Sequence, residues 1–312
     1  MITRYGGDNI DLIYIIDPYK YRQLLEKGIN KYLFKFVMPL YKANKIHDII
    51  IEDNIIGHIY GINLKPLDFN NDENIEEYIL NIKNVMDDEY GAIYIEEKLP
   101  LDVLEIIQSS LDVINQDDND IRIFNIPFII EALMLKMKRD IIKEEILIIT
   151  NDKEEALKII DLISNKFNFI SVLGLNELDG ESVYEEVLEN TGISVYLPQS
   201  SMVSLRRYGL IINTLDNPSI SLKGIRNNAI VIDFSSIKPF KGINKYVIED
   251  LSFDLSDLGL NDNPWIDKEV KLNLYSCLFK GKNRRFCRVF NNGGLISIEN
   301  FVNQGLKIKG GL

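Results

Sequence analysis

An alternation of apolar strands and amphipathic helices between residues 146 and 234 constrains the fold of this chain most strongly. The apolar segments cover 146–150, 169–173, 193–197, 210–214 and 229–234. Helical patterns separate them over 152–166, over 181–190 before Gly192, and over a short stretch at 200–208. Continuous apolar strands between amphipathic helices are typical of a parallel sheet covered on both faces. We therefore predict a Rossmann-like unit.

The chain before this alternation predicts a separate α/β domain. Its β-branched segments 10–17, 48–53 and 55–64 indicate strands, and the patterns over 19–33 and 129–138 indicate helices. A length of 312 residues also favours two domains. We predict an N-terminal α/β domain over 1–140. A Rossmann-like parallel-sheet domain follows over 141–312, and its C-terminal helical segment packs back on it.

The C-terminal part is predicted to hold two helices. Beyond residue 240 the chain is expected to be loop-rich until Pro264, where a helix begins. The last helix follows Ser297. In the first of these helices, Cys277 would share an apolar stripe with Ile266, Val270 and Leu274, at the spacing of core residues. On this interpretation Cys277 is a small buried hydrophobe.

Cysteine, histidine and charge usage exclude several classes of protein. With only two cysteines, Cys277 and Cys287, and two histidines, His47 and His58, neither a disulfide scaffold nor a metal site is expected. The net charge of −12 disfavours nucleic acid and anionic membranes as partners. No apolar run approaches the roughly 20 residues that span a bilayer, and the N-terminus does not resemble a secretory signal. We expect a cytoplasmic protein.

One short segment departs from the acidic balance. The sequence KGKNRRFCR carries five cations and no acid, and these are Lys280, Lys282, Arg284, Arg285 and Arg288. Such a run is either a solvated face or a contact site for an anion or an acidic protein. Both alternatives remain open.

The turn after the first predicted strand of the Rossmann-like unit lacks glycine. Dinucleotide folds place glycines here because backbone amides must approach a pyrophosphate closely. In residues 150–156 the carboxylates of Asp152, Glu154 and Glu155 instead enter the first helical turn, where they complement the helix dipole. Lys153 offsets part of that charge. The turn is therefore either a capped helix start that only supports the sheet or an altered cofactor turn that still binds the dinucleotide.

The carboxyl ends of two further strands offer polar groups for a cofactor. Glu177 is the acid that could bind ribose hydroxyls after the second strand, although it comes slightly late in the chain. Thr214 follows the fourth strand, at an edge where open α/β sheets bind ligands. Both positions are compatible with a crevice at this edge of the sheet.

The order of these pieces resembles the acyl-acyl carrier protein reductase and shikimate-dehydrogenase-like group. The segments LIYIIDP (12–18), IIGHIYGINLKP (55–66) and LISIENFVNQG (295–305) are similar to that group's opening strand, later strand and final helix. The segment ILIITNDKEEA aligns with its strand and Gly-x-x-Gly-x-x-Gly turn, with Thr150, Lys153 and Ala156 at the glycine positions. An arginine that is usual in the group falls on Leu175, and the following Asn176 matches.

The resemblance implies an acyl-thioester reductase that forms an aldehyde. The segment LYSCLF (274–279) would place the acyl-accepting thiolate at Cys277, and an acyl carrier protein would be the acidic partner of the run at Lys280 to Arg288. NADP or NAD would be the cofactor, and its binding is expected to be weak or absent. The candidate cofactor-binding residues are Thr150, Asn151, Lys153, Asn176 and Thr214.

Two functions follow from these patterns. The first is a divergent NAD(P)-dependent oxidoreductase with a degenerate cofactor turn. The second is a catalytically inactive Rossmann scaffold that acts through protein–protein interaction. Titration with NADPH and NADH discriminates between them.

Overall fold

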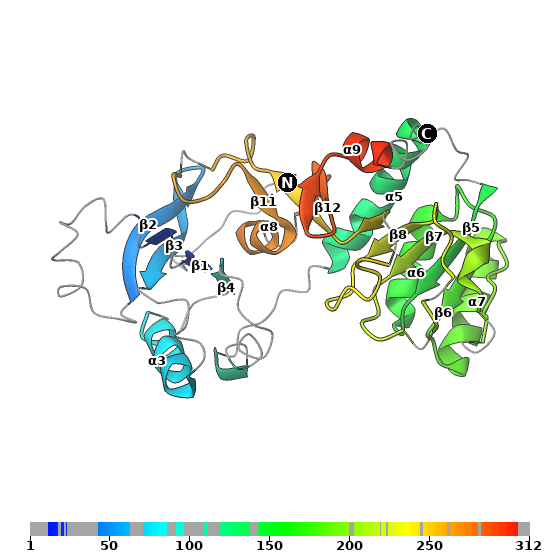
Figure 1. Cartoon of the computed structure of the whole chain (residues 1–312), viewed down its shortest axis with the longest axis horizontal. Helices are drawn as coiled ribbons and strands as arrows, with labels where there is room; N and C mark the ends of the chain where they lie inside the picture. The colour runs from blue at the N-terminus through cyan, green and yellow to red at the C-terminus, as the bar shows by residue number, and fades with distance from the viewer. Residues whose placement is uncertain are drawn as a thin grey trace, which may run out of the picture. The chain divides into compact units, whose positions relative to one another are not determined.

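A computed structural model describes most of the chain (Figure 1). The described residues are 12–17, 20, 21, 23, 43–62, 71–85, 92–96, 106, 109–111, 119–137, 143–199, 203–218, 220–222, 224–243, 246–260, 263–279 and 282–304. Most of the helix predicted over 19–33 falls outside them. No helix among these residues is long and apolar enough to cross a membrane.

Contacts divide the chain into two compact units. Met1–Asp117 and Leu255–Lys282 form the first, and Asp118–Asp254 and Asn283–Leu312 form the second, here called the sheet unit. The predicted domain limits of 1–140 and 141–312 differ from this division and stay a prediction. The contacts assign α5 (Asn119–Lys136) to the sheet unit and α8 (Leu272–Leu278) to the first unit.

The first unit contains a four-stranded mixed sheet in the order β2-β3-β1-β4. Its strands are β1 (Leu12–Ile15), β2 (Ala43–Ile51), β3 (Asn54–Ile62) and β4 (Ala92–Ile95). β1 pairs in parallel with β3 and β4, whereas β2 and β3 form an antiparallel hairpin. Helix α3 (Asp72–Lys83) packs its apolar face on Ile13 and Ile15. The short strand β11 (Glu269–Lys271) precedes α8.

The sheet unit is built on five parallel strands in the order β6-β5-β7-β8-β9. They are β5 (Glu145–Ile149), β6 (Ile170–Leu173), β7 (Tyr208–Asn213), β8 (Ile230–Asp233) and β9 (Val247–Ile248). Every pairing between them is parallel. The predicted parallel sheet is confirmed.

A backbone bridge beside β6 completes the strand order. Tyr196 pairs in parallel with Ser171, and its N–H and C=O each lie 3.0 Å from their partners on Ile170 and Val172. If this bridge is counted as the third position, the order becomes 3-2-1-4-5-6, which is that of dinucleotide-binding Rossmann folds. The sheet unit is Rossmann-like.

Helix boundaries in this unit follow local chemistry. Helix α6 (Lys153–Ile163) begins after its N-cap Asp152, and α7 (Glu177–Thr191) begins after Asn176. Gly192 ends α7 in the left-handed conformation, with a φ of 73°, as glycine does at helix ends. The last helix, α9 (Ile298–Asn303), is capped by Ser297 as predicted. Helix α6 lies between α5 and α7 and contacts both.

The core of the sheet unit is built from apolar side chains on the strands. Leu147, Ile149, Ile211, Val231 and Val247 cluster with residues that follow or precede the strands. Those residues are Leu205, Phe240 and the partly buried Val203, Leu215, Ile220, Leu222 and Ile225. The described members of this cluster come from strands, from a 3-10 helix and from extended segments. A 3-10 helix, η4 (Leu205–Arg207), and extended segments cover it.

Other local predictions hold only in part. Segment 193–197 forms only the bridge at Tyr196. Within the described part of the predicted helix 200–208, residues 205–207 form the 3-10 helix η4. The chain after residue 240 is not loop up to Pro264, because it forms β9 and then β10 (Asp250–Asp254). β10 pairs antiparallel with β12 (Arg288–Asn291), which pairs with β13 (Gly294–Ile296).

The helix predicted at Pro264 begins later, at Leu272. The Asn263 side chain accepts the Trp265 N–H at 2.9 Å, which closes a turn in place of a helical start. Ile266 and Val270 therefore lie outside the helix that holds Cys277. The predicted four-residue helical stripe does not exist, although Ile266, Val270 and Leu274 are all buried.

Candidate functional site

The first turn of α6 holds a carboxylate that is bound by three side chains. One oxygen of Glu155 accepts the hydroxyls of both Thr150 and Thr214, and the other accepts the Asn119 amide. The Glu155 backbone N–H donates to the N-cap Asp152 at 3.0 Å. The side chain and the backbone N–H of Glu155 therefore both have partners within the protein.

These contacts lie at the topological switch point of the sheet. Thr150 follows β5, and Thr214 follows the neighbouring β7. At a switch point the chain leaves two neighbouring strands toward opposite sides of the sheet. Ligands of open α/β sheets bind in the crevice that this leaves at the carboxyl ends of the strands. In this protein Glu155 places negative charge where a dinucleotide would place its pyrophosphate. Two like charges at about 4–5 Å repel by several kcal/mol near a protein surface.

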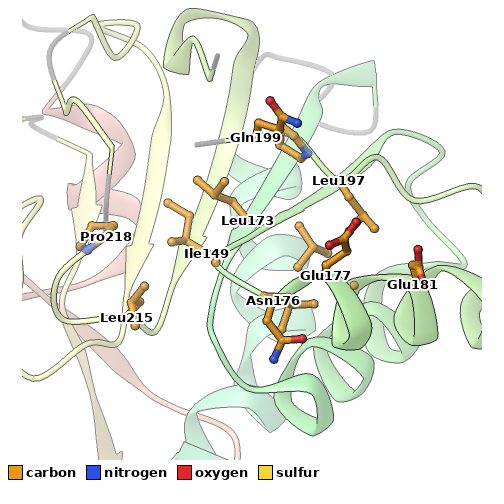
Figure 2. A pocket seen from close by; sticks show the side chains of 14 residues that line it. Ile149, Leu173, Asn176, Glu177, Glu181, Leu197, Gln199, Leu215 and Pro218 are labelled. Carbon is orange, nitrogen blue, oxygen red and sulfur yellow. The ribbon is translucent and has the colours of Figure 1, made fainter. Parts of the chain in front are cut away.

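A pocket of about 580 Å³ opens beside the switch point. Figure 2 shows Ile149 and Leu173 at its centre, Leu215 and Pro218 on one side, and Leu197 on the other. Its size is within the range of small-molecule sites. The walls are therefore apolar where β5 and β6 end.

Four polar side chains line this pocket. Asn176, Glu177 and Glu181 come from the start of α7, and Gln199 comes from the segment after Tyr196 (Figure 2). The Asn176 oxygen accepts the Asp179 N–H at 2.9 Å and so caps α7. Glu177, the acid that the sequence offered for ribose hydroxyls, is the first residue of α7 and faces this pocket.

Gly174 allows the chain to leave β6 close to β5. Its φ is 110°, and a Cβ atom at this position would lie 2.5 Å from the carbonyl oxygen of Thr150. A larger residue would force the end of β6 away from β5. The turn after β5, where a dinucleotide fold needs glycine, contains none. Gly174, which follows β6, instead shapes the pocket.

The structure brings together some of the predicted site residues. Thr150 and Thr214 meet at Glu155, and Asn176 lines the pocket. Lys153 instead lies 3.8 Å from Glu186 of α7, and the Asn151 side chain is exposed. Thr150 and Thr214 therefore lie together, whereas Asn151 and Lys153 point elsewhere, and the role of these residues in cofactor binding stays a prediction.

The two cysteines are not joined in a disulfide, and they differ in exposure. Cys277 is half-buried on α8 of the first unit, between the buried residues Ser276 and Leu278. Cys287 is exposed, and its sulfur lies 3.3 Å from the Ser252 hydroxyl. The role of Cys277 as an acyl acceptor stays a prediction.

A polar cluster at the carboxyl ends of β7 and β8 was not predicted from the sequence. The buried Asp233 carboxylate accepts the Asn213 amide at 2.8 Å, the Ser235 hydroxyl at 2.6 Å and the Phe240 N–H at 3.1 Å. Lys238 donates from Nζ to the Asp233 carbonyl oxygen at 3.0 Å. Burial lowers the pKa of Lys238 to about 8. The signal that could have indicated this cluster is the run of polar residues that ends each strand.

The first unit also holds paired polar groups. Nδ1 of the buried His58 lies 2.6 Å from the Asp48 carboxylate on the neighbouring strand. Burial, reinforced by nearby Glu96, raises the pKa values of Tyr14 and Tyr94 above their usual range. Within the described residues, no group of three or more His, Cys, Asp or Glu side chains could hold a metal ion.

Comparison with known proteins gives only distant likenesses. No family model and no curated protein matches the chain. Among solved structures, Δ1-pyrroline-2-carboxylate reductase from Thermococcus litoralis, determined with NADH and L-proline, is 15% identical over 37% of each chain, with a TM-score of 0.29. L-Tryptophan dehydrogenase from Nostoc punctiforme is 12% identical over 73% of this chain and 64% of its own, with a TM-score of 0.32. The chain thus spans less than two thirds of the length of these two proteins.

A third likeness extends over nearly the whole chain. Quinate dehydrogenase from Corynebacterium glutamicum, in complex with NAD, is 9% identical over 96% of this chain and 100% of its own, with a TM-score of 0.35. At these scores the likenesses say nothing about activity, and the fold assignment rests on strand order. None of the three is an acyl-acyl carrier protein reductase, so that part of the resemblance stays a prediction.

Proposed function

We propose that the sheet unit binds a small, phosphate-free molecule at the carboxyl ends of β5 and β6, and that it does not transfer hydride from a nicotinamide dinucleotide. The observation that carries this proposal is the Glu155 carboxylate, which Thr150 and Thr214 bind at the switch point. A dinucleotide would have to displace this carboxylate or accept its repulsion.

The open pocket at the ends of β5 and β6 indicates the class of ligand. Its apolar walls, including Ile149 and Leu173, suit a flat ring, and the carboxylates of Glu177 and Glu181 can accept hydrogen bonds from hydroxyl groups. These carboxylates disfavour an anion in the same space. A nucleoside without phosphate combines the required ring and hydroxyls.

Both functions inferred from the sequence bear on this proposal. An acyl-thioester reductase needs a bound nicotinamide as well as a reactive Cys277, and Glu155 opposes the first requirement. The proposal is therefore closer to the alternative of a Rossmann scaffold without redox chemistry. It differs from that alternative in assigning a ligand to the pocket.

Calorimetry with a graded set of ligands tests the proposal. We expect adenosine to bind more tightly than AMP, and AMP more tightly than ADP, because each phosphate adds charge near Glu155. NADH and NADPH are expected to have dissociation constants above about 1 mM, weaker than about −4 kcal/mol. Micromolar binding of NADPH, or ADP binding more tightly than adenosine, would contradict the proposal and favour the oxidoreductase.

A further inference from the structure

A second group of polar side chains lies at the other half of the sheet edge, where β8 and β9 end. Lys238 is in the loop after β8, and Glu249 directly follows β9. Both lie outside the pocket described above. The carboxyl ends of parallel strands are where α/β folds place reacting groups.

The backbone around Lys238 is held in an unusual conformation. Lys238 has a φ of 57°, in the left-handed region that side chains other than glycine, asparagine and aspartate rarely adopt. The Ser235 hydroxyl accepts the Lys238 N–H at 3.2 Å and donates to Asp233 at 2.6 Å. Strain of this kind persists only where surrounding contacts enforce it, and it concentrates at functional sites.

The Lys238 amine has an incomplete set of partners. Within the described part of the chain, its Nζ donates only to the Asp233 carbonyl oxygen and forms no ion pair. Charged groups face it from several elements: Asp233 at the end of β8, Glu249 after β9, Asp250 on β10 and Arg122 on α5. Burial outweighs the carboxylates among them and lowers the pKa of the amine to about 8. A neutral amine is a nucleophile.

Glu249 supplies an acceptor without a partner. Its side chain is 5% exposed, and Oε2 accepts the Gly293 N–H at 2.8 Å. Oε1 is buried and has no hydrogen-bond partner. An unsatisfied buried carboxylate oxygen is costly unless a bound group donates to it.

We propose that Lys238 forms an imine with a small aldehyde or ketone, and that Glu249 carries protons during the condensation. The Nζ lone pair attacks the carbonyl carbon, a C–N bond forms, and the oxygen takes up a proton while nitrogen loses one. The resulting carbinolamine then breaks its C–O bond, releases water and forms the C=N bond. One amine and one carbonyl compound give one imine and one water, with no change in oxidation state.

Reductive trapping of the full-length protein tests this proposal. Acetaldehyde and sodium cyanoborohydride at pH 7 leave an ethyl group on each amine that forms an imine, and peptide mass spectrometry locates it. We expect Lys238 to be ethylated at least tenfold faster than Lys241, an exposed lysine three residues away. Ethylation of Lys238 no faster than Lys241 overturns the proposal.

The variant Glu249→Gln separates proton transfer from a simple pKa effect. Loss of this carboxylate lowers the lysine pKa further, so a neutral amine acting alone would react faster at pH 7. We expect the opposite, a loss of at least fivefold in the ethylation rate of Lys238 with Lys241 unchanged, and a circular dichroism spectrum like that of the wild type. A rate that rises or stays the same overturns the role of Glu249. A misfolded Glu249→Gln protein is replaced by Glu249→Asp, for which partial retention of the rate is expected and a rate above wild type overturns that role.

Discussion

Thr214, at the end of β7, donates its hydroxyl to the Glu155 carboxylate in the first turn of α6. This contact joins the two sides of the switch point, where a dinucleotide would otherwise enter. It links a sequence feature, the glycine-free turn at 150–156, to a specific occupant of the site. Glu155 is therefore the residue whose substitution tests whether negative charge excludes phosphate here.

Removing the Glu155 carboxylate should admit phosphate. In Glu155→Ala, the hydroxyls of Thr150 and Thr214 lose the carboxylate as an acceptor, and the local negative charge falls by one. We expect ADP to bind at least tenfold more tightly than to the wild type, about 1.4 kcal/mol, in calorimetry at low salt. Glu154→Ala is the matched control, because it removes the same charge from an exposed position in the same helical turn. If both substitutions tightened ADP binding equally, the overall charge of the helix start, and not the position of Glu155, would account for the effect.

Asp233 should be a large contributor to stability. Asp233→Ala leaves the buried Phe240 N–H without its acceptor and removes the acceptor of the Ser235 hydroxyl. Loss of a buried, multiply bonded carboxylate is expected to cost about 3 kcal/mol in the free energy of unfolding. Urea denaturation measures this cost. The exposed Asp161 on α6 provides a control, since Asp161→Ala should change stability by less than about 0.5 kcal/mol. A similarly small loss in Asp233→Ala would show that the cluster is not a stabilising network.

The parallel sheet was predictable because its strands are buried on both faces and are apolar without interruption. β5, β7 and β8 show this pattern directly. The segment 193–197 shares the pattern but makes a single bridge at Tyr196, whose side chain remains 53% exposed. Hydrophobic periodicity identifies a segment that can form a strand. The number of residues that pair with the next strand depends on the segments that surround it in the fold.

The candidate site was only partly predictable, since its contacts join residues that are distant in sequence. The turn at 150–156 indicated that carboxylates replace a phosphate, but the Thr214 contact spans 59 residues and leaves no local pattern. Lys238 was missed for a similar reason. Its lowered pKa arises from burial, and the groups that face it include Arg122 and Glu249 on segments far away in the chain.

The low pKa of Lys238 predicts how stability depends on pH. The folded protein holds this amine at a pKa of about 8, below the value of 10.5 that applies when the chain is unfolded. Between these values the unfolded state binds more protons, so this group makes folding more favourable as the pH rises from 8 to 10.5. Lys238→Met removes that dependence. Its stability relative to the wild type should therefore fall by about 1 kcal/mol between pH 7 and pH 10, after allowance for partial exposure. Parallel pH profiles of the two proteins would refute a lowered pKa at Lys238.

The two cysteines should differ in reactivity. Cys287 is exposed, whereas Cys277 is half-buried on α8, so iodoacetamide at neutral pH is expected to modify Cys287 first. Mass spectrometry of partly alkylated protein gives both rates. Cys277→Ser serves as a control that assigns the faster phase. Rapid and selective modification of Cys277 would instead support the acyl-accepting thiolate implied by the resemblance.

The basic run is expected to be the contact site for an acidic protein, such as an acyl carrier protein. Lys280 lies outside the described residues, whereas Lys282 and Arg285 are exposed. Cation–π contacts already hold part of this charge: Lys282 lies over the Phe279 ring, and Arg285 lies 4.0 Å from the centre of the Phe128 ring. These contacts stabilise each side chain without neutralising it.

Binding through exposed cations should be strongly sensitive to salt, because charges are screened beyond about 10 Å at 0.1 M ionic strength. We expect purified acyl carrier protein to bind the wild-type chain at 20 mM salt, and binding to weaken at least tenfold at 200 mM. The variant with Lys280, Lys282, Arg284, Arg285 and Arg288 all changed to Ser should lose this binding. Replacement of five lysines elsewhere, at Lys45, Lys83, Lys153, Lys158 and Lys166, removes the same charge and controls for net charge. Equal losses in the two variants would assign the effect to overall charge and leave the run as an ordinary solvated face.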